Sequence, residues 1–178
     1  MPTDIAAIRA AEFPVAERAA YFDHASDSPA PVRAAKVIAE RTALLQDPLL
    51  SVRAREDYLA DAQRWLGKWL NAVPEQIAFL TNIVDATATV VNGLDWQAGD
   101  EVALVADEFA SFALPWKTLE RLGVRVVFVP RDGGAIEPER LAALTGSRTR
   151  VIAISDVEYT SGNRNDLAAI GELARSRG

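Results

Sequence analysis

Three segments of the first 75 residues have apolar and polar positions at a helical spacing, and an extended piece at 20–23 and a turn-rich loop separate the first from the second. This spacing predicts one helix over Thr3–Glu12 and a second over Val32–Leu45, which the Asp47-Pro48 pair should end. Ser51 is a candidate N-cap for a third helix. In that helix apolar residues recur every three or four positions: Val52, Leu59, Ala62, Trp65, Leu66, Trp69 and Leu70. The sequence therefore predicts an N-terminal helical arm over residues 1–75.

From Ile77 onward the pattern changes to short, uniformly apolar runs that alternate with helical segments. The runs lie at residues 77–81, 101–106, 124–130 and 150–155. The helical segments lie at about 84–94, 111–122, 138–144 and 166–176. Uniformly apolar strands separated by helices are typical of a parallel sheet that is covered on both faces. We therefore expect an α/β domain over residues 76–178.

Composition narrows the class of partner. Of the 178 residues, 49% are hydrophobic and 25% are charged, which is the balance of a soluble globular protein. A net charge of −6 argues against nucleic acid or an anionic membrane surface as a partner. The chain has no cysteine, and no run approaches the roughly 20 apolar residues of a membrane span. The N-terminus lacks the apolar core of a signal peptide, so a cytoplasmic location is expected.

Three loops are candidates for function, because ligands of such sheets bind at the carboxyl ends of the strands. They are residues 81–84, 106–112 and 155–165. Neither a dinucleotide-binding GxGxxG nor a P-loop is present. The segment "TNIV" at 81–84 precedes a helix, whose first turn can bind a phosphate through backbone amides. The alternative is that Thr81 or Asn82 is an ordinary N-cap.

Four segments in this order and spacing resemble the class V aminotransferase family, the pyridoxal-phosphate enzymes that include cysteine desulfurases and kynureninases. They are "YFDHASDSPAP", "IAFLTNIVDATATVVNGLDWQAGDEV", "DEFASFALPWKTLERLGVRVVFVP" and "RVIAISDVEYTSGNRNDLAAIGELARSRG". The resemblance implies the three-layer, mainly parallel sheet of the family's large domain, here incomplete, with strand order 3-2-4-5-6-7-1. It also implies pyridoxal 5'-phosphate as cofactor, an amino-acid substrate, and a homodimer when the protein is full length.

The resemblance assigns roles to residues of the three loops. Asn82, Ile83 and Val84 match the turn that holds the cofactor's phosphate, and Val84 replaces the family's usual Thr or Ser. Phe109 matches the residue that stacks on the pyridine ring, most often His, although a Phe at this place is also a natural core residue. Tyr159 stands where the family often has an Asn near the cofactor's 3-oxygen.

Other matching positions are less directly assigned. Asp156 replaces a frequent His and is expected near the cofactor, or else caps its loop. His24, Ala25 and Ser26 match the segment that borders the substrate, and His24 is otherwise a hydrogen-bonding loop residue. Arg164 is a candidate for binding a substrate carboxylate, with a solvent-facing role as the alternative.

The resemblance also indicates what the chain lacks. Pyridoxal-phosphate chemistry needs a Schiff-base lysine and an acidic group on the ring nitrogen, and the resemblance places both beyond Gly178. Lys36, Lys68 and Lys117 match neither position. We therefore expect the N-terminal half of a large domain, inactive alone, in which strand 77–81 has no neighbour. A non-catalytic relative that serves as a binding module and an unrelated α/β domain for a phosphorylated ligand are the alternatives.

Overall fold

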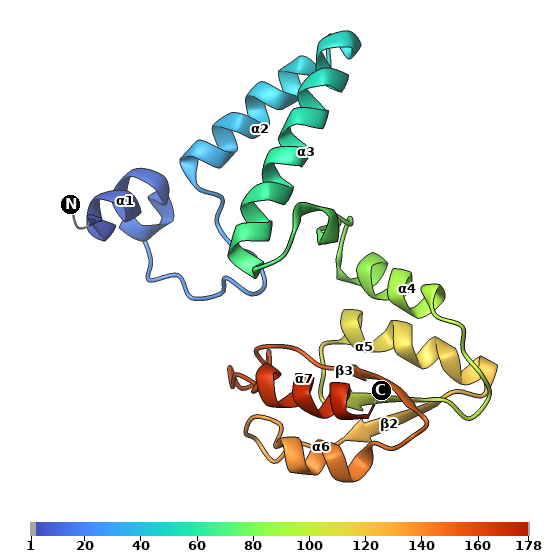
Figure 1. The fold of residues 1–178 in the computed structure, drawn as a ribbon. Coiled ribbons are helices and arrows are strands. Elements are labelled where there is room, and N and C mark those ends of the chain that lie inside the picture. The colour runs from blue at the N-terminus through green and yellow to red at the C-terminus, as the bar shows by residue number, and fades with distance from the viewer. Residues whose placement is uncertain (1–2, 178) are drawn as a thin grey trace. The chain divides into compact units, whose positions relative to one another are not determined.

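The computed structural model describes residues 3–177, except for the side chains of residues 51–57. The chain forms two compact units, one that ends at Ala78 and one that begins at Phe79 (Figure 1). Within the described residues, no helix combines the length and the apolar character that crossing a membrane requires.

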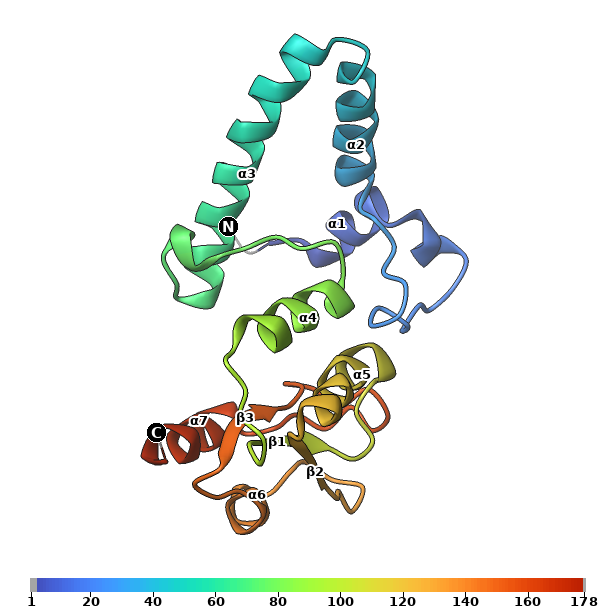
Figure 2. The ribbon, with the colours of Figure 1, turned by 90° about the vertical axis from the view of Figure 1, so that its right-hand side faces the viewer.

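The N-terminal unit is helical, as predicted. It contains α1 (Ile5–Glu12), α2 (Val32–Leu44) and α3 (Pro48–Leu70), together with short 3₁₀ helices at Pro14–Glu17 and Pro74–Gln76. Figure 2 shows α2 and α3 joined at one end as a helical hairpin. The Glu12 carboxylate at the end of α1 accepts a hydrogen bond from the Arg33 amide at 3.0 Å and pairs with its guanidinium at 2.9 Å. This contact fixes the start of α2.

The predicted N-cap of the third helix is wrong. Helix α3 begins at Pro48, and the Asp47 carboxylate accepts hydrogen bonds from the amides of Leu49 at 3.1 Å and Leu50 at 3.3 Å. An N-cap aspartate followed by proline at the first helical position is a stronger start than a serine four residues after that aspartate. Ser51 therefore lies inside the helix.

The C-terminal unit contains a parallel sheet of β1 (Glu101–Val105), β2 (Arg125–Val129) and β3 (Thr149–Ala153) in the order β2-β1-β3. This arrangement agrees with the 3-2-4 part of the expected order. The strand predicted at 77–81 is not formed in the described structure; this segment is irregular. Since β2 and β3 occupy both sides of β1, the 77–81 segment cannot pair with β1.

Helices cover both faces of the sheet, as the three-layer prediction requires. Val102 and Leu104 of β1 pack on one face in a core with residues of α4 (Ile83–Gly93) and α5 (Ala110–Lys117). Ala103 and Val105 pack on the other face with residues of α6 (Pro138–Leu144) and α7 (Leu167–Ser176). All five residues of β1 are buried. The helix predicted at 111–122 is divided, because α5 passes into a 3₁₀ helix at Thr118–Leu122.

Candidate functional site

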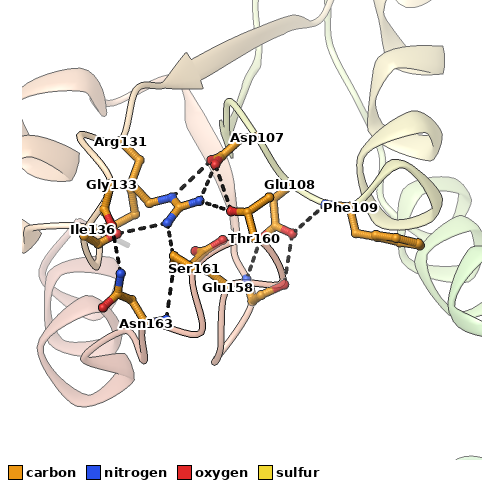
Figure 3. Close-up of polar contacts among 12 residues, drawn as sticks. Asp107, Glu108, Phe109, Arg131, Gly133, Ile136, Glu158, Thr160, Ser161 and Asn163 are labelled. Atoms are coloured by element: carbon orange, nitrogen blue, oxygen red, sulfur yellow. Dashed lines mark hydrogen bonds and ion pairs between the residues drawn. The ribbon is translucent and has the colours of Figure 1, made fainter. Parts of the chain in front are cut away.

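The carboxyl ends of the three strands carry a group of polar loops (Figure 3). Because the strands are parallel, the loops after β1, β2 and β3 all leave the sheet at the same edge. The loops after β1 and β3 are those that the sequence singled out. The loop after β2, which carries Arg131, was not among them.

Arg131 joins the three loops. Its Nε donates to Asp107 Oδ1 at 3.1 Å, and its Nη2 contacts the other Asp107 oxygen and Thr160 Oγ1, the latter at 2.6 Å. Its Nη1 donates to Ser161 Oγ at 2.7 Å and to the Gly134 carbonyl at 3.2 Å. The hydrogen bond from Arg131 holds the pKa of the Asp107 carboxyl below its usual range, and the same contact raises the pKa of the guanidinium. This ion pair is therefore charged at all ordinary pH values.

Glu108 forms a second link between the loops after β1 and β3. Its carboxylate accepts hydrogen bonds from the Ser155 amide at 2.7 Å and the Ser155 hydroxyl at 2.9 Å. It also accepts one from the Phe109 amide at 3.2 Å. The side chain is buried, so these donors take the place of water around the carboxylate.

Glu158 is the most deeply placed acid of the group, with 0% of its surface exposed. The Asn165 amide donates to its Oε1 at 2.7 Å, whereas its Oε2 has no hydrogen-bond partner in the described structure. Burial raises the pKa of the Glu158 carboxyl, and the nearby Glu108 charge adds to the increase. Asn165 also accepts from the Ile136 amide at 2.8 Å, which ties this acid to the loop after β2.

Two predicted cofactor residues meet at the surface of this group. The rings of Phe109 and Tyr159 lie edge to face, with centroids 5.1 Å apart and planes at 82°. Phe109 is 53% exposed and Tyr159 is 56% exposed. Phe109 is therefore no core residue. Figure 3 shows its side chain pointing away from Arg131 and the buried acids.

Asp156 and Arg164 form a second predicted pair. Arg164 Nε lies 3.2 Å from Asp156 Oδ1, and Val157 and Arg164 form an isolated antiparallel bridge. Gly162 closes the turn between them with φ of 70°, a conformation that side chains disfavour. The guanidinium of Arg164 remains largely solvent-exposed. The two charges neutralise each other at the mouth of the loop.

The segment 82–84 forms the start of α4. Asn82 is the N-cap, and its Oδ1 accepts from the Asp85 amide at 2.9 Å. The amides of Ile83 and Val84 have no acceptor within the helix, because they belong to its first turn. Both side chains are exposed. No hydrogen bond or ring contact joins this turn to Phe109, Tyr159 or Arg131 in the described structure.

His24, Ala25 and Ser26 belong to the N-terminal unit, whereas the residues described above belong to the C-terminal unit. The ring of His24 lies edge to face with Tyr21 at 5.3 Å, and its Nδ1 is 3.4 Å from Ser28 Oγ. All three predicted residues are exposed. The contacts of His24 fit a loop hydrogen-bonding role.

The sequence predicted no catalytic residue within the chain, because the Schiff-base lysine is expected beyond Gly178. Gly178 itself lies outside the described residues, so the structure does not test this expectation, and it stays a prediction. The lysines that the chain does contain are exposed, and they lie on α2, α3 and α5: Lys36, Lys68 and Lys117. None of the hydrogen bonds of the polar loops described above involves a lysine.

Sequence reasoning missed Arg131, Glu108, Glu158 and Asn165. One signal was present: the polar run "RDGG" at 131–134 follows β2 after a single residue, Pro130, at the same end of its strand as the two loops that were singled out. No cluster of three or more potential metal-ligating side chains occurs among the residues searched, those that the structure describes.

Comparison with known proteins identifies the family. The model of the family "Aminotransferase class-V" matches residues 21–178. A protein named probable cysteine desulfurase from Methanothermobacter thermautotrophicus is 27% identical over 94% of this chain and 43% of its own length. Two solved structures share the fold. A C-DES mutant with glycine covalently linked to the PLP cofactor has a TM-score of 0.86 at 22% identity, covering 100% of this chain and 47% of that one. The complex of the cystine C-S lyase C-DES with its reaction product cysteine persulfide has a TM-score of 0.84 at 23% sequence identity. The match covers 92% of this chain and 45% of that one.

The chain thus spans less than half the length of these relatives. The family match nevertheless extends over most of the chain and includes all three loops at the carboxyl edge of the sheet. This chain belongs to the aminotransferase class-V family, of which it represents an N-terminal portion.

Proposed function

We propose that this chain is part of a pyridoxal-phosphate-dependent enzyme that removes sulfur from a cysteine-type amino acid. The family match over residues 21–178 is the observation that carries the proposal. The names of the similar proteins, cysteine desulfurase and cystine C-S lyase, support the sulfur-containing substrate class over plain transamination.

The residues of the C-terminal unit suit the cofactor's chemistry. The uncapped amides of Ile83 and Val84 and the positive end of the α4 dipole would bind its phosphate. The exposed face of Phe109 would pack on the flat ring, and the Tyr159 hydroxyl would donate to the 3-oxygen. Each group is accessible and offers the donor or surface that its assigned part of the cofactor needs.

When bound, pyridoxal phosphate supplies an electron-withdrawing ring that stabilises negative charge on the α-carbon of an amino acid. The chain's own residues would bind and orient the amino-acid substrate. Arg164 would exchange its partner Asp156 for a substrate carboxylate, a move that its exposed position permits. His24, Ala25 and Ser26 would border the substrate.

A second candidate function is a non-catalytic binding module. Three observations favour it. Val84 has no hydroxyl for a phosphate, Phe109 can transfer no proton, and the Asp156 carboxylate is already neutralised by Arg164. Release of sulfide from cysteine by the full-length protein, with added cofactor and a thiol reductant, separates the two. A protein that binds cofactor but releases no sulfide is the module.

The proposal includes two features of the whole protein. The large domain would begin at residue 76, after an arm of residues 1–75, and the full-length protein would be a homodimer. The indoles of Trp65 and Trp69 on α3 are 70% and 88% exposed, and exposed tryptophans of this kind are typical of protein interfaces.

Substitution of Val84 tests the phosphate site. In the full-length protein, Val84→Thr should tighten pyridoxal-phosphate binding by at most about 1.5–3 kcal/mol, because it adds one hydrogen bond to a charged group. Pyridoxal, which lacks the phosphate, should bind equally to both forms. Val90→Thr is the matched control, since Val90 is exposed on the same helix, outside its first turn. Equal affinities for Val84→Thr and wild type would show that the turn does not face the phosphate.

A further inference from the structure

Arg131 is the most enclosed of the ion-paired arginines in the described part of the C-terminal unit. Its side chain is only 3% exposed. A guanidinium has five N–H donors, and the five contacts of Arg131 reach Asp107 twice, Thr160, Ser161 and the Gly134 carbonyl. The geometry of Arg131 is thus fully specified by its partners.

The partners of Arg131 lie beside the aromatic pair. Asp107 is two residues before Phe109, and Thr160 follows Tyr159 directly. Thr160 Oγ1 also lies 3.3 Å from Asp107 Oδ2, so the two loops touch at this point. Arg131 comes from the end of β2 and therefore braces the loops that carry both rings. The rings themselves make contact with only each other as aromatic partners among the described residues.

We propose that Arg131 is a positioning residue, which holds Phe109 and Tyr159 in the arrangement that receives the cofactor ring. This inference rests on the proposed function for the identity of the ligand. The position of the two rings, by contrast, is a property of the chain itself and can be measured without any cofactor.

The contacts of Arg131 depend on the planar guanidinium group, whose N–H donors point in several fixed directions. Lysine would keep the positive charge beside Asp107, but it has three donors around one nitrogen and cannot contact both Asp107 oxygens and both hydroxyls in a plane. Arg131→Lys therefore removes the brace and retains the charge. Arg140→Lys is the matched control. Arg140 pairs with Asp132 at 2.6 Å, and none of its contacts is to the loops that carry the rings.

The first measurement is fluorine NMR of the cofactor-free, full-length protein labelled with 3-fluorotyrosine. This chain has three tyrosines, and Tyr159→Phe identifies the signal of Tyr159. The centroid of that ring lies 5.1 Å from the centroid of Phe109, within its ring-current field, so a change in their arrangement moves the signal. Arg131→Lys should shift the Tyr159 signal and leave those of Tyr21 and Tyr58 in place, while Arg140→Lys should shift none. An unchanged Tyr159 signal in Arg131→Lys overturns the proposal.

The second measurement is a titration with pyridoxal phosphate and, in parallel, with inorganic phosphate. Arg131→Lys should weaken pyridoxal-phosphate binding by about three- to tenfold, the size of one aromatic contact, and leave phosphate binding unchanged. Equal weakening of both ligands, or cofactor affinity equal to that of Arg140→Lys, overturns the proposal. A wild-type protein that binds no pyridoxal phosphate contradicts the proposed function, and the fluorine signal alone then decides the role of Arg131.

Thr160→Val keeps the proposal testable should Arg131→Lys fail to fold. Valine is close to threonine in shape, and the substitution removes one acceptor of Arg131 and leaves its pairing with Asp107. A shift of the Tyr159 signal that is smaller than the one expected for Arg131→Lys supports the positioning role of Arg131. A Tyr159 signal identical to that of the wild type overturns it.

Discussion

Replacement of Glu108 should loosen the connection between β1 and β3 at the site. Glu108→Ala removes an acceptor that receives three hydrogen bonds, two from Ser155 and one from the Phe109 amide. The Ser155 hydroxyl can rotate to another partner, and water can reach the exposed Phe109. The main loss is therefore the charge-assisted bond from the Ser155 amide, at 2.7 Å the shortest of the three.

The expected magnitude follows from that bond. A hydrogen bond to a charged group contributes about 1.5–3 kcal/mol, so Glu108→Ala should lower the free energy of unfolding by about 2–4 kcal/mol, once the partial losses at the other two donors are included. That is a large part of a domain stability of about 5–15 kcal/mol. Glu108→Gln keeps one acceptor oxygen for the Ser155 amide and should lower the free energy of unfolding by about 1 kcal/mol. The expected order of stability is wild type, then Gln, then Ala.

The assay is urea unfolding followed by circular dichroism, together with hydrogen exchange at the Ser155 amide. The midpoint should fall without a change in the slope of the transition, and exchange at Ser155 should accelerate. Glu172→Ala is the control, because Glu172 is exposed on α7 and none of the hydrogen bonds above involves it. If Glu108→Ala and Glu172→Ala differ by less than about 0.5 kcal/mol, Glu108 does not stabilise this edge of the sheet.

Two further predictions concern a buried acid and the lysines. Burial raises the pKa of Glu158, so its contribution to stability is fully present below the ordinary glutamate pKa of about 4.3 and is lost as pH rises through the raised value. Glu158→Gln should therefore gain stability relative to wild type as the pH rises above about 4.3, whereas Glu139→Gln should not. A pH-independent difference in thermal unfolding would contradict the reasoning. Borohydride treatment of the 178-residue chain with pyridoxal phosphate should give only scattered labelling of Lys36, Lys68 and Lys117, whereas a stoichiometric adduct on one of them, mapped by mass spectrometry, would refute the expectation.

The parts of the fold that follow from local pattern were predictable. The apolar run of β1 is buried on both faces as a central parallel strand should be, and Asn82 is the helix cap that its residue type favours. The run at 77–81 is also largely apolar but forms no strand in the described structure. An apolar composition indicates that a segment can be buried in a sheet. Strand formation also needs a neighbouring strand, and the local sequence does not show whether one is present.

The polar contacts of the site could not be predicted, because they join residues that are distant in sequence. Arg131 lies 24 residues from Asp107 and 29 from Thr160, and Glu108 lies 47 from Ser155. A charged residue after a strand is most often solvent-exposed, and the polar run that contains Arg131 indicates a loop without showing that this side chain is enclosed. The family resemblance also does not help here, since it assigns the residues that face the ligand and not those behind them.

The ion pair between the enclosed Arg131 guanidinium and the half-exposed Asp107 carboxylate is better explained by conformation than by stability. Enclosing a guanidinium costs solvation free energy that its contacts only partly return, so a pair of this kind contributes little net stability even when every donor is satisfied. What such a pair does change is the number of arrangements open to its loops, because the Arg131 guanidinium holds Thr160 at 2.6 Å and Ser161 at 2.7 Å. Three residues that are predicted to face the ligand, Val84, Phe109 and Asp156, depart from the family pattern, whereas Arg131 makes a full set of five contacts. Loss of Arg131 should therefore alter what the loops bind more than how firmly the chain folds.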